Sequence, residues 1–490
     1  MPDPSALYDE IERLEAQVRA DAARRMEKWR AWPTESDCAA SLENLAAYLA
    51  LRDSDLRATQ RDLMALGLSS LGRLESRVYP TLDALLAALA ALAGRKKRAL
   101  IDEDAFFAGE RELSLRAQSL FGEVSSARGV ALLVTCPSEA ATDRSFMLGL
   151  AERGVEALRI NCAHDDADKW AEMIDHVHAA GARTGRRMKI FMDLGGPKVR
   201  TGAFKALRHE KRLELDELLA LATPGALGEV SKHDAHFAVE CTLPEALAAS
   251  RPGDRISLDD GKVEAKVERV EEAFLIARVT RCDSDGYKLK SEKGLNFPDA
   301  ELVLPALTAK DRADLAFVAR HADAIDFSFV QTVEDVEMLQ EALAELRPDD
   351  WRQIPLVLKI ETPRAVRNLP DLIACALSRQ PTAVMIARGD LAIEMGFTRL
   401  AEMQEEILWI CEAARIPVIW ATQVMENLVK TGGFSRGEMT DAAMAGRAEC
   451  VMLNKGPHLH KAIAELDRLL GRMEAHMHKK TPQMRRLTSW

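Results

Sequence analysis

The chain has 490 residues, 47% of them hydrophobic, which is enough for two or three domains with a large buried core. Its net charge of -11 argues against a nucleic acid or an anionic membrane surface as the main partner, because both select clustered Lys and Arg. The 8 cysteines form no CxxC pair, and the first residues, Met-Pro-Asp-Pro, contain no basic apolar leader. We therefore expect a globular, cytoplasmic protein with no membrane segment.

The first 128 residues are predicted to be helical. Apolar residues recur at helical spacing, as at Leu7, Ile11, Leu14 and Val18, in a stretch rich in Ala, Leu, Arg and Glu. Pro and Gly residues divide the region into several helices. Nothing in it has the spacing of a catalytic motif.

After Gly129, short apolar runs alternate with amphipathic helical stretches. Strict alternation of this kind predicts a parallel sheet, and eight such units favour a closed (β/α)₈ barrel. The eight predicted strands are Ala131–Thr135, Ala157–Asn161, Lys189–Leu194, Ala324–Phe329, Leu356–Glu361, Ala383–Arg388, Pro417–Gln423 and Cys450–Asn454.

Between the third strand and a helix expected from Ala309, the alternation is interrupted. Segments with period-2 patterning, such as Arg255–Leu258 and Phe274–Val279, lie among turns at Asp260-Gly261 and Asp285-Gly286. They predict a small, barrel-like β domain inserted into the larger barrel. The predicted fold is thus α/β, with a helical region at 1–128, a (β/α)₈ (TIM) barrel at 129–202 and 303–490, and a β lid domain at 203–302.

Polar residues stand at the carboxyl ends of the predicted strands, where a barrel of this kind has its active-site rim. Any one of them could belong to an ordinary buried ion pair, but strand order predicts that they converge. Glu361 and Asp390 suit Mg²⁺ or Mn²⁺, and Arg159 and Lys359 beside them would form a phosphate site, a combination typical of phosphoryl transfer. The rim residues are Arg159, Asn161, Asp193, Lys359, Glu361, Arg388, Asp390 and Thr422.

The same residues stand in segments that resemble the pyruvate kinase family. Residues 158–164 (LRINCAH) are similar to the family's R-x-N-F-S-H strand end, and residues 193–202 (DLGGPKVRTG) to its D-T-K-G-P-E-I-R-T-G. The resemblance covers about residues 130–455 and leaves the region before 130 uncovered. Further matches in the same order are 304–311 (LPALTAKD), 328–330 (SFV), 359–362 (KIET), 387–391 (ARGDL) and 421–426 (ATQVME), with 259–261 (DDG) and 293–296 (KGLN) in the inserted domain.

The resemblance implies a phosphotransferase that moves the phosphoryl group of phosphoenolpyruvate to ADP, giving pyruvate and ATP. By this resemblance Lys359 would stabilise the phosphoryl group in transit, Arg159 would clamp it, and Glu361 and Asp390 would hold Mg²⁺. The nucleotide would lie between barrel and lid, and the closing lid would exclude water. The residues that this carry-over places near the nucleotide are Pro137, His164, Arg200 and Lys293.

The resemblance also implies how the substrate carboxylate is bound. The backbone amides of Gly389 and Asp390, together with Thr422, would hold it. Thr422 would in addition belong to the path that delivers a proton to the methylene carbon of enolpyruvate.

The monovalent cation site of the family is altered in this chain. Asn161, Asp193 and Leu194 match its ligand positions, but Ala163 lacks the oxygen ligand usual there. Lys198 stands where potassium-requiring members carry Glu, and an ammonium group reaching this pocket would supply the charge that K⁺ otherwise provides. We expect activity without K⁺; the alternative is that Lys198 faces solvent.

Two further departures concern the end of the barrel. The family's S-G-E-T-A-K-G segment is replaced by residues 454–458 (NKGPH), which removes a hydroxyl and a carboxylate near the proton path. A final helix around 459–478 is followed by no counterpart of the family's C-terminal effector domain, so allosteric control of the usual kind is not expected. The N-terminal region would either cover the barrel surface left open or bind a partner, and a homo-oligomer stays open.

Two other functions are compatible with parts of the sequence. The first is another enol-acid enzyme on a similar barrel, either an aldolase or lyase or a kinase of a different enol acid; the inserted lid argues against the aldol class. The second is a non-catalytic descendant that binds a metabolite or nucleotide and acts through its helical N-terminus. The replaced loop at Asn454 favours it. The joint presence of the proposed site residues speaks against it; these are Lys359, Glu361, Asp390, Arg159 and Thr422.

Overall fold

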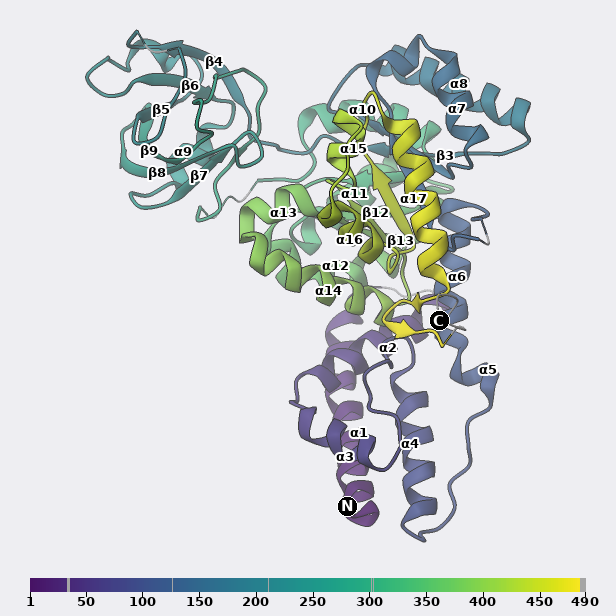
Figure 1. The fold of residues 1–490 in the computed structure, drawn as a ribbon. Helices are drawn as coiled ribbons and strands as arrows, with labels where there is room; N and C mark the ends of the chain where they lie inside the picture. Colours follow the sequence, from purple (N-terminus) through teal and green to yellow (C-terminus); the bar gives the residue numbers. More distant parts are fainter. Residues whose placement is uncertain (33–35, 126, 210, 301, 303, 485–490) are drawn as a thin grey trace.

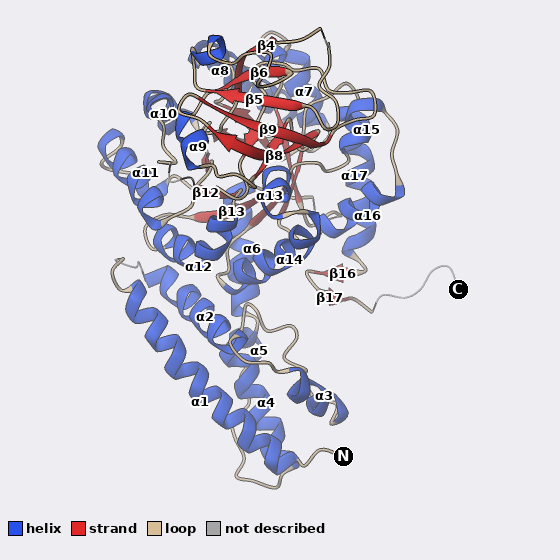
Figure 2. Cartoon of the chain, turned by 90° about the vertical axis from the view of Figure 1, so that its left-hand side faces the viewer, coloured by secondary structure: helices blue, strands red, loops and turns tan. Residues whose placement is uncertain are grey.

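A computed structural model describes residues 1–490 except 33–35, 126, 210, 301, 303 and 485–490. Eight parallel strands form a closed barrel in the order β1-β15-β14-β13-β12-β11-β3-β2, which confirms the predicted fold class (Figures 1 and 2). Each strand lies within or beside one of the eight predicted runs. They are β1 (Ala131–Thr135), β2 (Ala157–Asn161), β3 (Lys189–Asp193), β11 (Ala324–Phe327), β12 (Leu356–Ile360), β13 (Thr382–Ala387), β14 (Val418–Ala421) and β15 (Cys450–Leu453).

Helices cover the outside of the barrel (Figure 2). Several begin at capping boxes, in which a Thr or Ser side chain and an acidic residue three positions later satisfy the free backbone N–H groups; Thr308, Thr332 and Ser435 start helices this way. The barrel helices are α7 (Arg144–Glu152), α8 (Ala167–Thr184), α10 (Ala309–His321), α11 (Val333–Leu346), α12 (Pro363–Leu377), α13 (Arg388–Met395), α14 (Phe397–Ala413), α15 (Glu426–Thr431), α16 (Arg436–Ala445) and α17 (Leu459–Glu474), with short 3₁₀ turns η1 (Ser138–Ala141) and η3 (Trp351–Gln353).

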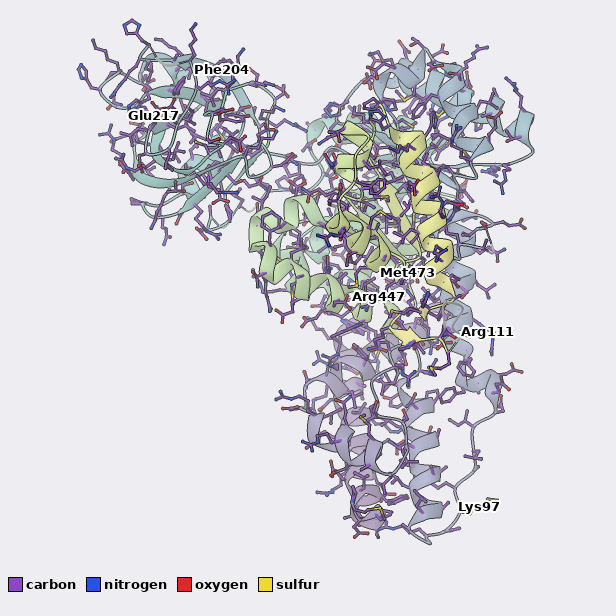
Figure 3. The ribbon with its side chains drawn as sticks, viewed as in Figure 1. Lys97, Arg111, Phe204, Glu217, Arg447 and Met473 are labelled. Carbon is purple, nitrogen blue, oxygen red and sulfur yellow. The ribbon has the colours of Figure 1, made fainter. Side chains whose placement is uncertain are left out.

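The inserted domain is a second sheet with its own hydrophobic core, on the left of Figure 1. A backbone bridge between Arg200 and Gly294 joins the two edges of the sheet, so the sheet curls round on itself. Phe204 and Glu217 lie on the part of this domain away from the barrel (Figure 3). The elements, in sheet order β10-β7-β8-β9-β5-β6-β4, are β4 (Thr201–Ala206), β5 (Leu218–Ala222), η2 (Ala226–Gly228), β6 (Phe237–Cys241), α9 (Pro244–Ala249), β7 (Arg255–Leu258), β8 (Val263–Val270), β9 (Phe274–Arg281) and β10 (Leu295–Asn296).

The N-terminal region is helical, as predicted, and it packs against the barrel (Figure 1). Helices α1 and α2 contact barrel helices α12 and α14, and the side chain of Asn44 donates to the carbonyl oxygen of Ala413 at 2.8 Å. The N-terminal helices therefore cover part of the barrel surface. Their expected role in place of a C-terminal domain, or in binding a partner, stays a prediction. Its elements are α1 (Pro4–Trp29), α2 (Ser36–Arg52), α3 (Arg57–Ala65), α4 (Val78–Leu92), α5 (Glu103–Phe106) and α6 (Ala108–Phe121).

Helix α6 packs against the end of the barrel at which the strands begin. Phe121, at its last turn, is 1% exposed and stacks on Phe191 of β3 with the ring centroids 5.8 Å apart. Leu120 joins the same cluster of inward-facing barrel residues. A hairpin of β16 (Met477–His478) and β17 (Thr481–Pro482) lies at the same end. In the part of the chain that the structure describes, no helix is both long and apolar enough to cross a membrane.

Candidate active site

Four inward-facing polar side chains form a buried cluster at the carboxyl ends of β2, β3, β11 and β12. Lys359 Nζ lies 2.9 and 3.0 Å from the two carboxylate oxygens of Asp193 and also donates to the hydroxyl of Ser328. Arg159 Nε donates to Asp193 Oδ2 at 2.7 Å. Asp193 is therefore the shared anion that orients both cations.

The charges in this cluster are stabilised by one another. Burial disfavours the ionised form of Asp193, but Arg159 and Lys359 outweigh it and lower the Asp193 pKa. Burial likewise disfavours the Lys359 ammonium, but Asp193 and Glu361 outweigh it and raise the pKa of Lys359. Both Lys359 and Arg159 are thus cationic at neutral pH and point towards the rim.

Two carboxylates lie beside the cations. Glu361 Oε1 is 3.5 Å from Lys359 Nζ, and Glu361 Oε2 accepts a hydrogen bond of 2.6 Å from the amide of Phe329. Burial, and the neighbouring charge of Asp390, raise the pKa of Glu361 against the opposing effect of Lys359. Two carboxylates that repel each other in a buried site suit a divalent cation, because Mg²⁺ binds one or two carboxylates and keeps water or substrate oxygens.

Lys198 reaches this pair of carboxylates from the segment between β3 and β4, where the chain enters the inserted domain. Its ammonium nitrogen lies 2.7 Å from Asp390 Oδ1. Burial alone would lower the pKa of Lys198, but the Asp390 carboxylate raises it, so the ion pair is maintained at neutral pH. The alternative that Lys198 merely faces solvent is wrong.

The segment after β14 places a hydroxyl opposite the start of α13. Thr422 has a φ of 63°, in the left-handed region that is unfavourable for a β-branched residue. Its Oγ1 accepts a 2.7 Å hydrogen bond from the amide of Gly389, and its carbonyl accepts one of 2.6 Å from Arg388. These bonds hold a strained backbone at the rim.

Comparisons with known proteins agree with this architecture. Residues 130–457 match the family model described as pyruvate kinase, barrel domain. This chain belongs to the pyruvate kinase family. It is 30% identical over 360 residues to pyruvate kinase 1 of Trypanosoma brucei brucei, covering 72% of this chain and 68% of the relative. It is 31% identical over 321 residues to pyruvate kinase of Corynebacterium efficiens, covering 64% of this chain and 63% of the relative.

The chain therefore spans about two thirds of the length of these pyruvate kinases. Among solved structures, a pyruvate kinase from Cryptosporidium parvum has the same fold, with a TM-score of 0.62 and 23% sequence identity over 74% of this chain and 73% of that one. The N-terminal helices precede the matched barrel.

In this pyruvate kinase family member, the predicted rim residues largely meet. Arg159, Asp193, Lys359 and Glu361 form one contact network, and Asp390 joins Lys198 beside it. The residues predicted as monovalent-cation ligands already have protein partners. Asp193 is held by the two cations, Asn161 Oδ1 accepts from the amide of Ala163 at 3.0 Å, and the amide of Leu194 donates to the carbonyl oxygen of Asp326 at 3.0 Å.

The residues predicted for the nucleotide are only partly brought together. His164 and Arg159 line one cavity of about 300 Å³, together with Lys455 of the replaced loop. Burial, then Lys455 and Arg200, lower the pKa of His164, so this side chain is neutral at pH 7. The described lining of this cavity does not include Pro137, Arg200 or Lys293; the last pairs with Asp259 at 3.1 Å within the inserted domain.

Sequence reasoning missed three residues of the site. Ser328 follows β11 directly, so the rule that selected the other rim residues also applies to it. Asp326, 0% exposed, stands inside an otherwise apolar strand, which was a visible signal of an unusual group. Lys455 faces the cavity because the loop after β15 is changed, and no pattern in the sequence indicated its direction.

Proposed function

We propose that this protein transfers the phosphoryl group of phosphoenolpyruvate to ADP, giving pyruvate and ATP, with Mg²⁺ and without a need for K⁺. The observation that carries the proposal is the contact network of Lys359, Arg159 and Asp193 next to the carboxylates Glu361 and Asp390. Two oriented cations and two carboxylates at one barrel rim match the charges that develop in phosphoryl transfer.

The chain's own groups would act mainly by position and charge. Arg159 would bind the phosphate, and Lys359, already held by Asp193 and Ser328, would stabilise the phosphoryl group as it moves. Because these contacts orient Lys359 before substrate arrives, little reorganisation is needed at the reaction step.

Glu361 and Asp390 would hold Mg²⁺, which when bound would offset negative charge on the substrate oxygens. To bind it, Asp390 must exchange its ion pair with Lys198 for the metal. The amides of Gly389 and Asp390 and the hydroxyl of Thr422 would hold the substrate carboxylate. Thr422 Oγ1 already accepts from the Gly389 amide, so substrate would take over that amide.

Lys198 supports the independence from K⁺. Its ammonium group carries a permanent positive charge into the site on a chain segment next to the lid. A charge supplied by the protein needs no monovalent ion to be bound. In this arrangement the ammonium stands against Asp390, and Arg159 and Lys359 already neutralise Asp193.

The test measures pyruvate release from phosphoenolpyruvate, ADP and Mg²⁺, with and without K⁺. We expect activity in both buffers and its loss in Lys359→Met, while Lys97→Met, an exposed lysine at the far end of the N-terminal helices (Figure 3), behaves as wild type. We expect Lys198→Met to lose at least about tenfold in rate without K⁺, since one charge is removed from a buried site. Equal silence of wild type and Lys359→Met would refute the reaction; wild-type activity that appears only with K⁺ would refute the role of Lys198.

A further inference from the structure

A second cavity lies at the root of the inserted domain, outside the active-site network. It has a volume of about 530 Å³, within the range of small-molecule sites. One wall comes from the inserted domain around β10, and the other comes from the start of α12 with Phe329. Lys198 and Phe329, which bond to Asp390 and Glu361 respectively, stand between this cavity and the two carboxylates.

Besides Lys198, the described lining contains two arginines that form no salt bridge with a described residue. Arg364 and Arg367 are three residues apart on α12, so they lie on the same face of the helix. Neither forms a hydrogen bond or an ion pair with a residue that the structure describes. Arg364 contributes only the last and smallest effect on the lowered pKa of Glu334, after hydrogen bonds and burial.

The acidic groups of the described lining, Asp299 and Glu394, form no ion pair with these arginines. Asp299 is occupied by Arg255, which donates to both of its carboxylate oxygens at 3.0 and 2.8 Å. Glu394 accepts a 2.9 Å hydrogen bond from Asn296, and burial raises its pKa to about 7, so about half of it is uncharged at neutral pH. The charged groups of the described lining, Lys198, Arg364 and Arg367 against Asp299 and a half-ionised Glu394, therefore leave an excess of positive charge.

The first turn of α12 leaves one backbone donor available. Pro363 has no N–H, and the amide of Ala365 donates to the side chain of Thr362 at 3.2 Å. The amide of Arg364 has no hydrogen-bond partner among the described residues. Backbone N–H and guanidinium donors together match the several oxygens of a phosphate.

Part of the opposite wall is apolar. Val199, Leu295 and Phe297 are nearly buried, and Leu302 and Leu304 complete the surface. We propose that this cavity binds a small phosphate monoester with an apolar or aromatic body, the phosphate on Arg364 and Arg367 and the body against Phe297 and its neighbours. Such a ligand contacts the inserted domain and the barrel together.

The proposal is tested with phenyl phosphate as the probe, titrated by calorimetry in the absence of ADP. The double variant Arg364→Gln/Arg367→Gln should bind the probe at least about tenfold more weakly, because two charged hydrogen-bond donors are lost. Arg352→Gln removes an exposed arginine from η3, outside this cavity, and should bind as wild type does. Arg159→Gln, which impairs the active-site phosphate clamp, should also retain this binding.

Three results would overturn the assignment. They are unchanged affinity in the double variant, loss of the probe in Arg159→Gln, and binding of phenylacetate as tight as that of phenyl phosphate. If the double variant does not fold, the single variants Arg364→Gln and Arg367→Gln are used, and their unfolding midpoints are compared with that of Arg352→Gln. Because no turnover is measured, a negative result leaves the proposed reaction untouched.

Discussion

The contact of Phe121 with the barrel interior predicts that the N-terminal region is needed for barrel stability. Phe121→Ala removes a ring that is 1% exposed and stacked on Phe191. Loss of the buried ring surface costs about 2 kcal/mol. A residual cavity of roughly 100 Å³ adds about 2 kcal/mol if the barrel does not relax. We therefore expect the free energy of unfolding to fall by about 4 kcal/mol.

The assay is urea unfolding followed by near-ultraviolet circular dichroism, which reports on packed aromatic side chains. Leu115→Ala is the matched control, because Leu115 stands on the same helix and is 65% exposed. It should change the unfolding free energy by less than about 0.5 kcal/mol. If both variants unfold at the same urea concentration, α6 does not support the barrel and the reasoning fails.

Three further predictions concern buried charged groups. Burial raises the pKa of Glu394 from 4.5 to about 7, so the native state keeps a proton that the unfolded chain releases, and the free energy of unfolding should fall as the pH rises from 4.5 to 7. Glu394→Gln should flatten this pH dependence in urea titrations across that window, and an unchanged slope would contradict the prediction. Burial and the Asp193 charge raise the pKa of Asp326 well above its usual range, and neither of its carboxyl oxygens has a hydrogen-bond partner among the described residues. Asp326→Asn should therefore raise the free energy of unfolding at pH 8 by about 1–3 kcal/mol, and a loss of stability would count against this reasoning. Arg388→Met should remove the hydrogen bond that supports the strained Thr422 backbone, so we expect kcat to fall at least about tenfold and the free energy of unfolding to fall by about 3–5 kcal/mol. A kcat within twofold of wild type would show that Thr422 holds its position without Arg388.

The barrel could be predicted from the sequence because each strand is a short apolar run that ends in a polar residue or is directly followed by one. The ends of strands were less predictable. The run at 324–329 stops as a strand at Phe327, since Phe329 has a φ of 57°, and the run at 417–423 stops at Ala421, since Thr422 and Gln423 are also left-handed. Because apolar character does not indicate left-handed backbone conformations, both predicted strands extended beyond the residues at which the observed strands end.

Side-chain contacts between segments that are distant in the sequence were also difficult to predict. The types of Lys359, Glu361 and Asp390 indicated the chemistry, and strand order indicated that they converge. The partner of Lys198 could not be predicted in this way. It is separated from Asp390 by 192 residues, and the sequence does not show which acidic rim residue its ammonium group reaches. The role of Phe121 was hidden for a similar reason: helical spacing marks an apolar face but not what that face contacts.

The packing of the N-terminal helices on α12 also has a consequence for how the chain is made. Trp29 donates to Asp371 at 2.8 Å, across 342 residues of sequence. At the ribosome's pace of about 5–20 residues per second, α1 would wait roughly 17–70 s for the helix it packs on. The main partners of α1, helices α2 and α4, are made early, so only its contact with α12 is delayed. The N-terminal helices can therefore assemble with one another before the barrel on which they dock is complete.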